Sequence, residues 1–193
     1  MNIYRTFAIV SVSIAVFVLI VASLGMIATT GVSEPSYGYL NTSQLNSINV
    51  TSPGVHVSRV NSTIYVNSSS IIPVMMGPMD TSSMYSFEIL GITNPTIVVK
   101  EGVKVQFTAV NVDNDSYHNF ALSSRGPPFS SMGPGMMGGS GYMTTMHYLP
   151  PMSSGTYAYS NFSYVFHSTG SFWYLCTYPG HAQDGMYGRI VVS

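Results

Sequence analysis

Charge is the scarcest feature of this sequence. Only 7% of its 193 residues are Asp, Glu, Lys or Arg, whereas a typical soluble domain has about 25%. With a formal net charge of −1, the chain has no basic patch that could bind the phosphates of nucleic acid. A surface with few carboxylates also loses little stability in acid, which favours an acidic exterior and an acid-living organism.

The N-terminal part has no charge at all between Arg5 and Glu34, and residues 7–27 are almost continuously apolar. About 20 such residues span a bilayer as a helix, whereas the apolar core of a signal peptide is usually about 7–15 residues long. We therefore expect residues 1–33 to be a single-pass anchor in the cell membrane, with a cleaved signal segment as the alternative. Arg5 favours a cytoplasmic N-terminus. The rest of the chain is then extracytoplasmic, or secreted after cleavage.

Cysteine is almost as scarce as charge. Cys176 is the only one, so no internal disulfide can form. A single cysteine in an exported protein is either buried and inert or engaged in chemistry. Cys176 is therefore the residue that a functional account must explain.

The exported part divides by composition. Residues 34–85 are rich in Ser, Thr and Asn, which is typical of a linker, although residues 55–60 and 62–66 could form strands. From residue 86 onward, apolar and polar residues alternate, as at 103–108 and 171–176, and Gly and Pro separate the runs. The sequence predicts an all-β sandwich or barrel.

Three metal-binding side chains follow one another at equal intervals near the C-terminus. Cys176, His181 and Met186 lie between two expected strands, and nearby Gly and Pro residues permit a tight loop. Taken singly, each is more often structural. Together with a second imidazole they form the ligand set of a type 1 (blue) copper site. A zinc site would more usually have four His, Cys or carboxylate ligands and no Met.

The second imidazole is less certain from the residues alone. His118 lies in an earlier expected strand and is the best candidate. His167 lies beside the Gly170 turn, where a structural role is expected. His56 and His147 are expected at the surface.

Several short stretches support a family resemblance. They are Ser86-Phe87-Glu88, Asn94-Pro95-Thr96, Gly126-Pro127-Pro128, Pro179-Gly180-His181-Ala182 and Gly185-Met186-Tyr187-Gly188. In this order they resemble the cupredoxins, and most closely the rusticyanin family. The sulfocyanin family is the nearest rival and implies the same chemistry.

The resemblance implies a Greek-key β-sandwich for residues 86–193. It also implies one type 1 copper ion with His118, Cys176, His181 and Met186 as its ligands. Residues 34–85 more weakly resemble the N-terminal extension that wraps the rusticyanin sandwich. We therefore expect residues 37–72 to be mostly folded onto the domain, against the linker interpretation.

Two features depart from the family pattern. Rusticyanins have Ser directly after the upstream His ligand, where this chain has Asn119. Hydrogen bonds near the Cys sulfur help to set the copper potential, so a very high potential does not carry over. The second feature is a Met-rich loop formed by Met132, Met136, Met137, Met143 and Met146. It is interpreted as a hydrophobic rim, with a transient Cu(I) site or docking surface as the alternative.

These observations predict a monomeric electron carrier in a respiratory chain, not an enzyme. Its expected partners are a cytochrome or iron-oxidising donor and a terminal oxidase acceptor. Copper storage or delivery through the Met-rich loop is the alternative. A multicopper enzyme needs further His clusters, and no His-X-His pair occurs. A binuclear copper centre needs two cysteines.

Within the site, we expect His118 to be buried and His181 to lie near the surface, where its ring edge lets the electron leave. Aromatic residues in and after the last long strand are expected to keep water from the copper. They are Phe172, Trp173, Tyr174 and Tyr178.

Overall fold

The computed structural model describes residues 36–48, 50–78, 83–129 and 141–193. These all belong to the compact unit Gly31–Ser193, and a separate unit comprises Met1–Thr30. The expected membrane anchor lies outside the described residues, as do Met132, Met136 and Met137 of the Met-rich loop. Within the described ranges, no helix is long and apolar enough to cross a membrane.

Nearly all regular structure in the described residues is β-strand. The one exception is a short helix, α2 (Thr42–Ile48). The strands are β1 (Ser36–Asn41), β2 (Val55–Ser58), β3 (Thr63–Val66), β4 (Ser70–Met76), β5 (Phe87–Ile89), β6 (Ile92–Thr93), β7 (Thr96–Val99), β8 (Lys104–Asn111), β9 (Ala121–Ser123), β10 (Tyr142–Thr145), β11 (Thr156–Val165), β12 (Gly170–Leu175) and β13 (Tyr187–Val192). The all-β prediction is confirmed.

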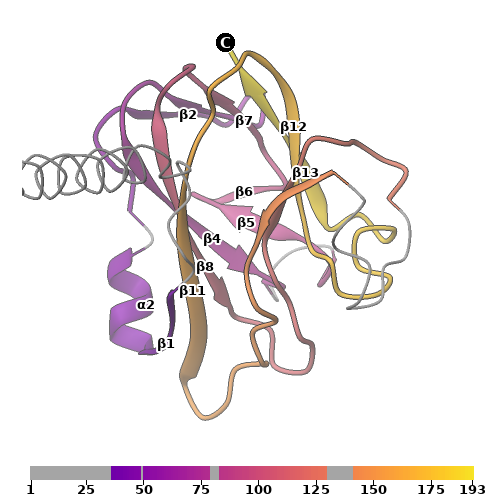
Figure 1. Ribbon diagram of the computed structural model, residues 1–193. Helices are drawn as coiled ribbons and strands as arrows, with labels where there is room; N and C mark the ends of the chain where they lie inside the picture. The colour runs from indigo at the N-terminus through magenta and orange to yellow at the C-terminus, as the bar shows by residue number, and fades with distance from the viewer. Residues whose placement is uncertain (1–35, 49, 79–82, 130–140) are drawn as a thin grey trace, which may run out of the picture. The chain divides into compact units, whose positions relative to one another are not determined.

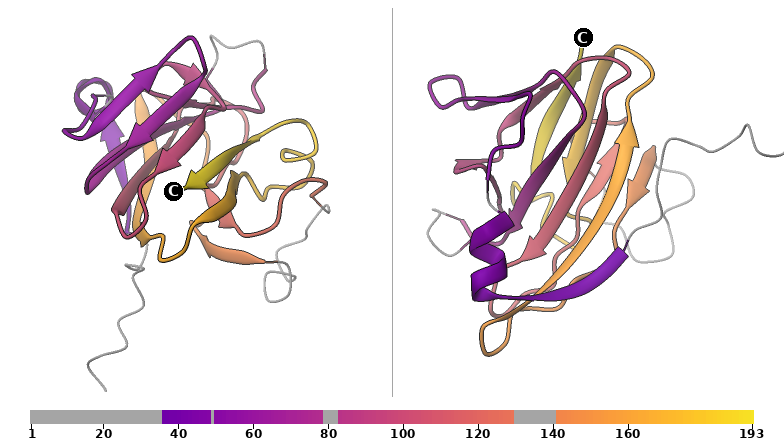
Figure 2. Two further views of the ribbon diagram at one scale, coloured as in Figure 1. Left: turned by 90° about the horizontal axis from the view of Figure 1, so that it is seen from above. Right: turned by 90° about the vertical axis from the view of Figure 1, so that its left-hand side faces the viewer.

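The strands form two sheets that pack into a sandwich (Figures 1 and 2). One sheet has the order β1-β11-β8-β4-β5-β6, and the other has the order β10-β9-β12-β13-β7-β3-β2. The segment expected to be an extension thus contributes strands to both sheets. Its strand β4 runs parallel to β8 and antiparallel to β5, and α2 packs against β1 and β11.

The core follows from the alternation seen in the sequence. Along β8, the side chains of Val105 and Phe107 are fully buried, whereas Lys104 is exposed. The Phe107 ring lies 5.0 Å from that of Phe120 and 5.6 Å from that of Phe162 (centroid to centroid). Burying one such side chain contributes about 1.5–3 kcal/mol. This aromatic core fixes the strand ends from which the functional loops extend.

Candidate metal centre

Three of the four expected ligands lie in the loop that joins β12 to β13, at the end of the sandwich away from the C-terminus (yellow in Figure 1). Backbone bonds close this loop: Cys176 N donates to Met186 O at 3.1 Å, and Met186 N donates to His181 O at 2.9 Å. The fourth residue, His118, comes from the segment before β9, where it forms an isolated bridge with Leu149. Two segments far apart in the sequence therefore meet here.

The donor atoms of His118, Cys176 and His181 all lie within 4.8 Å of one another. The two Nδ1 atoms are 3.1 Å apart, and Cys176 Sγ lies 3.5 Å from Nδ1 of His181 and 3.9 Å from Nδ1 of His118. All three side chains are buried, and so is that of Met186. Three of the four residues predicted from the sequence are thus brought to one place, and Met186 is buried in the same loop.

His118 is held by a carboxylate. Its Nε2 atom lies 3.0 Å from Oδ2 of Asp113, and both side chains are buried. This bond keeps a proton on Nε2 and leaves Nδ1 free to bind a metal. Burial lowers the pKa of His118. Burial alone would raise the pKa of Asp113, but hydrogen bonds from His118 and Asp115 bring it below its usual value.

Space around this pair is tight because Gly77 packs against it. Gly77 has a φ of +66°, and a Cβ atom there would lie 2.7 Å from both Asp113 and His118 Nε2. The position therefore requires glycine for its backbone conformation and for its closeness to the ligand.

The thiol of Cys176 is fully buried, and burial raises its pKa to about 11. Hydrogen bonds from the backbone of Asn119 and of Tyr178 offset part of this effect. The Asn119 side chain also joins the two ligand-bearing segments. Its Oδ1 accepts from Thr177 N at 2.7 Å, and its Nδ2 donates to Thr177 Oγ1 at 2.8 Å.

Comparisons with known proteins agree with this geometry. A family model described as multicopper oxidase matches residues 86–193. A solved structure of rusticyanin from Thiobacillus ferrooxidans superposes with a TM-score of 0.70 at 24% identity, covering 83% of this chain and 99% of that one. Rusticyanin from Acidithiobacillus ferridurans is 30% identical over 68% of this chain and 64% of its own length. Rusticyanin from Acidithiobacillus ferrooxidans is 32% identical over 68% of this chain and 77% of its own length.

The chain belongs to the rusticyanin family of cupredoxins. The resemblance inferred from the short sequence motifs is thereby confirmed. The donor set of two imidazoles, one thiol and one thioether fits a single type 1 copper ion, and the soft thiolate and thioether favour copper over the hard cations.

His181 is more deeply buried than the sequence predicted. Only 5% of the residue is exposed, because the rings of Tyr85 and Tyr178 lie 4.6 and 4.7 Å from its own. Burial, and then the neighbouring His118, lower the pKa of His181 to about 4. The sequence pattern missed Tyr85, which comes from the segment before β5.

The aromatic residues expected around the copper are only partly there. Tyr178 covers His181, as predicted. Phe172 instead packs on Phe166, and Trp173 lies near Tyr187 and Phe129. Tyr174 is buried in the core against Phe87 and Phe120. Within the described residues, the ring contacts of these three side chains are with other aromatic residues and not with His118 or His181.

The remaining histidines lie outside the cluster. His56, His147 and His167 are all exposed, as the sequence predicted for His56 and His147. Of the described residues in the Met-rich loop, Met146 is 2% exposed and Met143 packs against the core. These two thioethers therefore serve packing.

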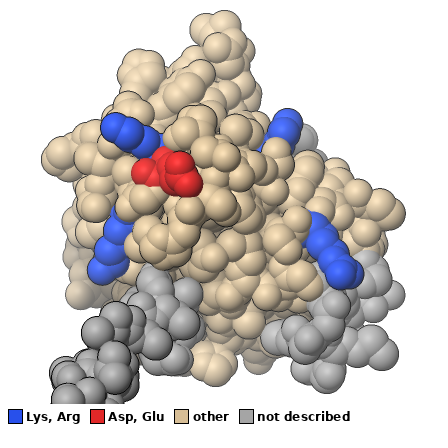
Figure 3. Space-filling view, turned by 45° about the horizontal axis from the view of Figure 1, so that its top comes forward, with Lys and Arg blue, Asp and Glu red and all other residues tan. Residues whose placement is uncertain are grey.

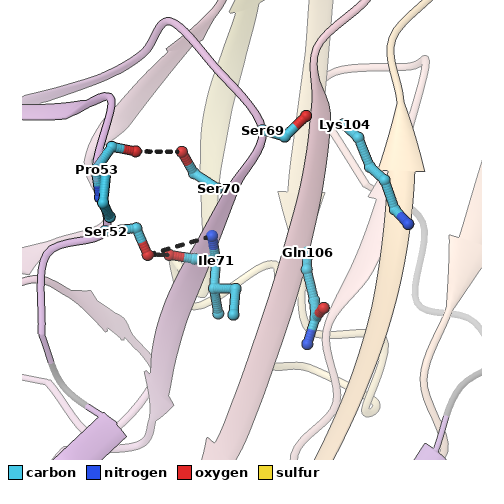
Figure 4. A pocket seen from close by; sticks show the side chains of 7 residues that line it. All are labelled: Ser52, Pro53, Ser69, Ser70, Ile71, Lys104 and Gln106. Atoms are coloured by element: carbon cyan, nitrogen blue, oxygen red, sulfur yellow. Dashed lines mark hydrogen bonds between the residues drawn. The ribbon is translucent and has the colours of Figure 1, made fainter.

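One hollow on the described surface lies elsewhere. Its volume is about 360 Å³, and its lining includes Ser52, Ser70, Lys104 and Gln106 (Figure 4). The hydroxyls of Ser52 and Ser70 already donate to backbone carbonyls. On the face in Figure 3, the described Lys and Arg side chains stand well apart and form no basic patch.

Metal binding is expected to release a proton. At pH 7–8 the metal-free Cys176 thiol is protonated because its pKa is about 11, whereas His181, with a pKa of about 4, is neutral. Binding Cu(II) to the thiolate then releases about one proton, so the apparent affinity rises about tenfold per pH unit. Below pH 4, His181 must also lose a proton, and the release increases. Calorimetry in buffers of different ionisation enthalpy measures this number, and a value near zero at pH 7–8 would exclude the thiolate as a ligand.

Proposed function

We propose that this protein carries single electrons through one copper ion bound by His118, Cys176, His181 and Met186. The proposal depends mainly on the convergence of two Nδ1 atoms and one Sγ atom within 4.8 Å in a buried pocket. When bound, the copper supplies a one-electron couple between Cu(II) and Cu(I).

The residues around the pocket favour electron transfer because they hold the ligands in place. Asp113 fixes the ring of His118, and the loop backbone ties Cys176 to Met186. Ligands held by packing and hydrogen bonds rearrange little when the oxidation state changes. The surrounding apolar core excludes water, which favours the less charged Cu(I) state.

A run of ring contacts leads from the pocket to the surface. The Tyr178 ring contacts His181 and stacks on Tyr117, with a centroid distance of 6.4 Å and an interplanar angle of 11°. Tyr117 is 46% exposed. In our proposal the electron leaves through this side of His181, and a redox protein approaches here.

The wider setting follows from composition and family. We propose an extracytoplasmic carrier anchored by residues 1–33, in the respiratory chain of an acid-living organism. Its donor is a cytochrome or an iron-oxidising protein, and its acceptor is a terminal oxidase. Membrane fractionation tests the anchor. The full chain should stay with the membrane, and a variant that lacks residues 7–27 should not.

One observation favours a different function. The family model that matches residues 86–193 is described as multicopper oxidase, which raises an oxidase as the competitor. Storage or delivery of copper by the Met-rich loop is a second alternative. An oxidase consumes oxygen when given a reductant, and a storage protein binds several Cu(I) ions.

Copper counting combined with oxygen uptake distinguishes the three functions. We expect one tightly bound copper per chain, reversible one-electron reduction and no oxygen consumption above that of free copper. Several Cu(I) ions per chain, retained in a Cys176→Ala variant, would instead indicate storage. Catalytic oxygen uptake would indicate an oxidase.

A further inference from the structure

The peptide bond before Met186 is held from both sides. Its carbonyl oxygen, Gly185 O, accepts a hydrogen bond from Asn94 Nδ2 at 3.1 Å. Its N–H belongs to Met186 and donates to His181 O at 2.9 Å. The two bonds together fix the plane of this peptide, from which Met186 and its side chain extend.

Gly185 does not hold this orientation by packing. Its φ is +102°, and a Cβ atom added there would have no neighbour within 4 Å. A glycine in open space has a wide choice of backbone conformations. Hydrogen bonds therefore fix it. Its carbonyl accepts from Asn94 outside the loop and from Tyr187 N at 2.8 Å within it, and its N–H donates to Ala182 O at 3.3 Å.

Asn94 is itself attached firmly to the core. Its Oδ1 accepts from Phe87 N at 2.9 Å, and its own N–H donates to Phe87 O at 2.8 Å. Its φ of +44° lies in the left-handed region that Asn tolerates better than most residues. The next residue, Pro95, accepts a hydrogen bond from the buried Tyr174 hydroxyl at 2.6 Å.

We propose that Asn94 is a positioning residue that fixes Met186, the expected thioether ligand, through the carbonyl of Gly185. Asn94 comes from the turn between β6 and β7, and the hydrogen bonds of its side chain go to Phe87 and Gly185. It acts by anchoring the ligand loop to Phe87 at the start of β5. This inference rests on the proposed copper site.

Two substitutions of Asn94 differ in the side-chain bonds that they remove. Asn94→Asp retains the acceptor for Phe87 N but presents an oxygen to Gly185 O, so the bond becomes a repulsion. Asn94→Gly tolerates the positive φ and loses both side-chain bonds, while its backbone N–H still donates to Phe87 O. Tyr174→Phe is the control, because it removes the bond to Pro95 O and leaves Asn94 and Gly185 intact.

Both Asn94 variants are expected to bind one copper and to change its electronic signature. A less well aimed thioether donates more weakly, which favours Cu(I). We expect the ratio of Cu(I) to Cu(II) affinity to rise about tenfold, equivalent to about 59 mV in midpoint potential for one electron. The electron paramagnetic resonance spectrum should change its rhombicity, while the metal-free variants melt cooperatively.

Each protein has its own expected result. Tyr174→Phe should keep the wild-type spectrum and potential, even if it melts earlier. Wild-type spectra and potentials in both Asn94 variants would overturn the positioning role and leave the copper site intact. A wild-type protein that binds no copper would instead overturn the proposed function. If Asn94→Asp fails to fold, the spectrum and potential of Asn94→Gly alone test the positioning role.

Discussion

Replacing Cys176 by Ser is expected to abolish the intense visible absorption of the copper-loaded protein. The absorption of a blue copper site depends on the bond between copper and a thiolate, and Cys176 is the only cysteine in the chain. A serine hydroxyl is nearly the same size, but it is harder and stays protonated. We therefore expect complete loss of the band and a large loss of Cu(I) affinity. Absorption spectra and competition with a Cu(I) chelator measure the two effects.

The control for this change is His167→Ala. His167 is an exposed histidine outside the cluster, and its loss should leave both the band and the affinity unchanged. Burying a hydroxyl costs about 1–3 kcal/mol, so the metal-free Cys176→Ser protein should still fold. A blue Cys176→Ser protein would show that another residue binds the copper.

Replacing Asp113 by Ala is expected to weaken copper binding by about 10–100-fold, the usual cost of losing a hydrogen-bond partner of a ligand. The substitution removes the acceptor of His118 Nε2, so the ring is no longer held with Nδ1 toward the metal. It also leaves a buried N–H without a partner. Asp113→Asn retains a neutral acceptor and should lose less. Copper titration in competition with a chelator measures the copper affinity of the wild-type protein and of both Asp113 variants.

Asn114→Ala is the matched control for this second change. Asn114 lies in the same turn and is exposed. Its loss should change copper affinity little. Equal affinities for the Asp113 and Asn114 variants would mean that Asp113 does not orient His118.

The ligands within one loop were predictable because they are close in the sequence. Cys176, His181 and Met186 follow one another with turn residues between them, so a short loop must bring them together. His118 could not be selected in this way. Its place depends on the bridge to Leu149, and that contact is invisible in local sequence. The residues alone made His118 the best candidate, and the family resemblance identified it as the ligand.

Long-range packing explains the remaining differences. The burial of His181 comes from Tyr85, which lies far away in the sequence but packs against its ring. The strand β4 was also hard to predict because Pro73 lies inside it, and proline usually excludes a central strand. Pro73 is nevertheless aligned with Thr108 in the parallel pair with β8. On its other side, β5 pairs with β4 only at Met75 and Met76. Pro73 thus has a paired strand on one side only, a position at which a proline is tolerated.

The proposed role of Asn94 has the same origin. In the sequence, the motif that contains Asn94 indicates only the family resemblance. Its function depends on a hydrogen bond to Gly185, which lies near the other end of the domain sequence. The local pattern indicates a turn at this position, and the fold determines what the turn holds.

A redox titration followed by visible absorption tests the whole account most directly. One thiolate, two imidazoles and a thioether around a single metal should give a blue protein with Cu(II). The colour should bleach and return reversibly with one electron per chain. Protein that binds Cu(II) but stays colourless, or that needs more than one electron per chain, would contradict the account.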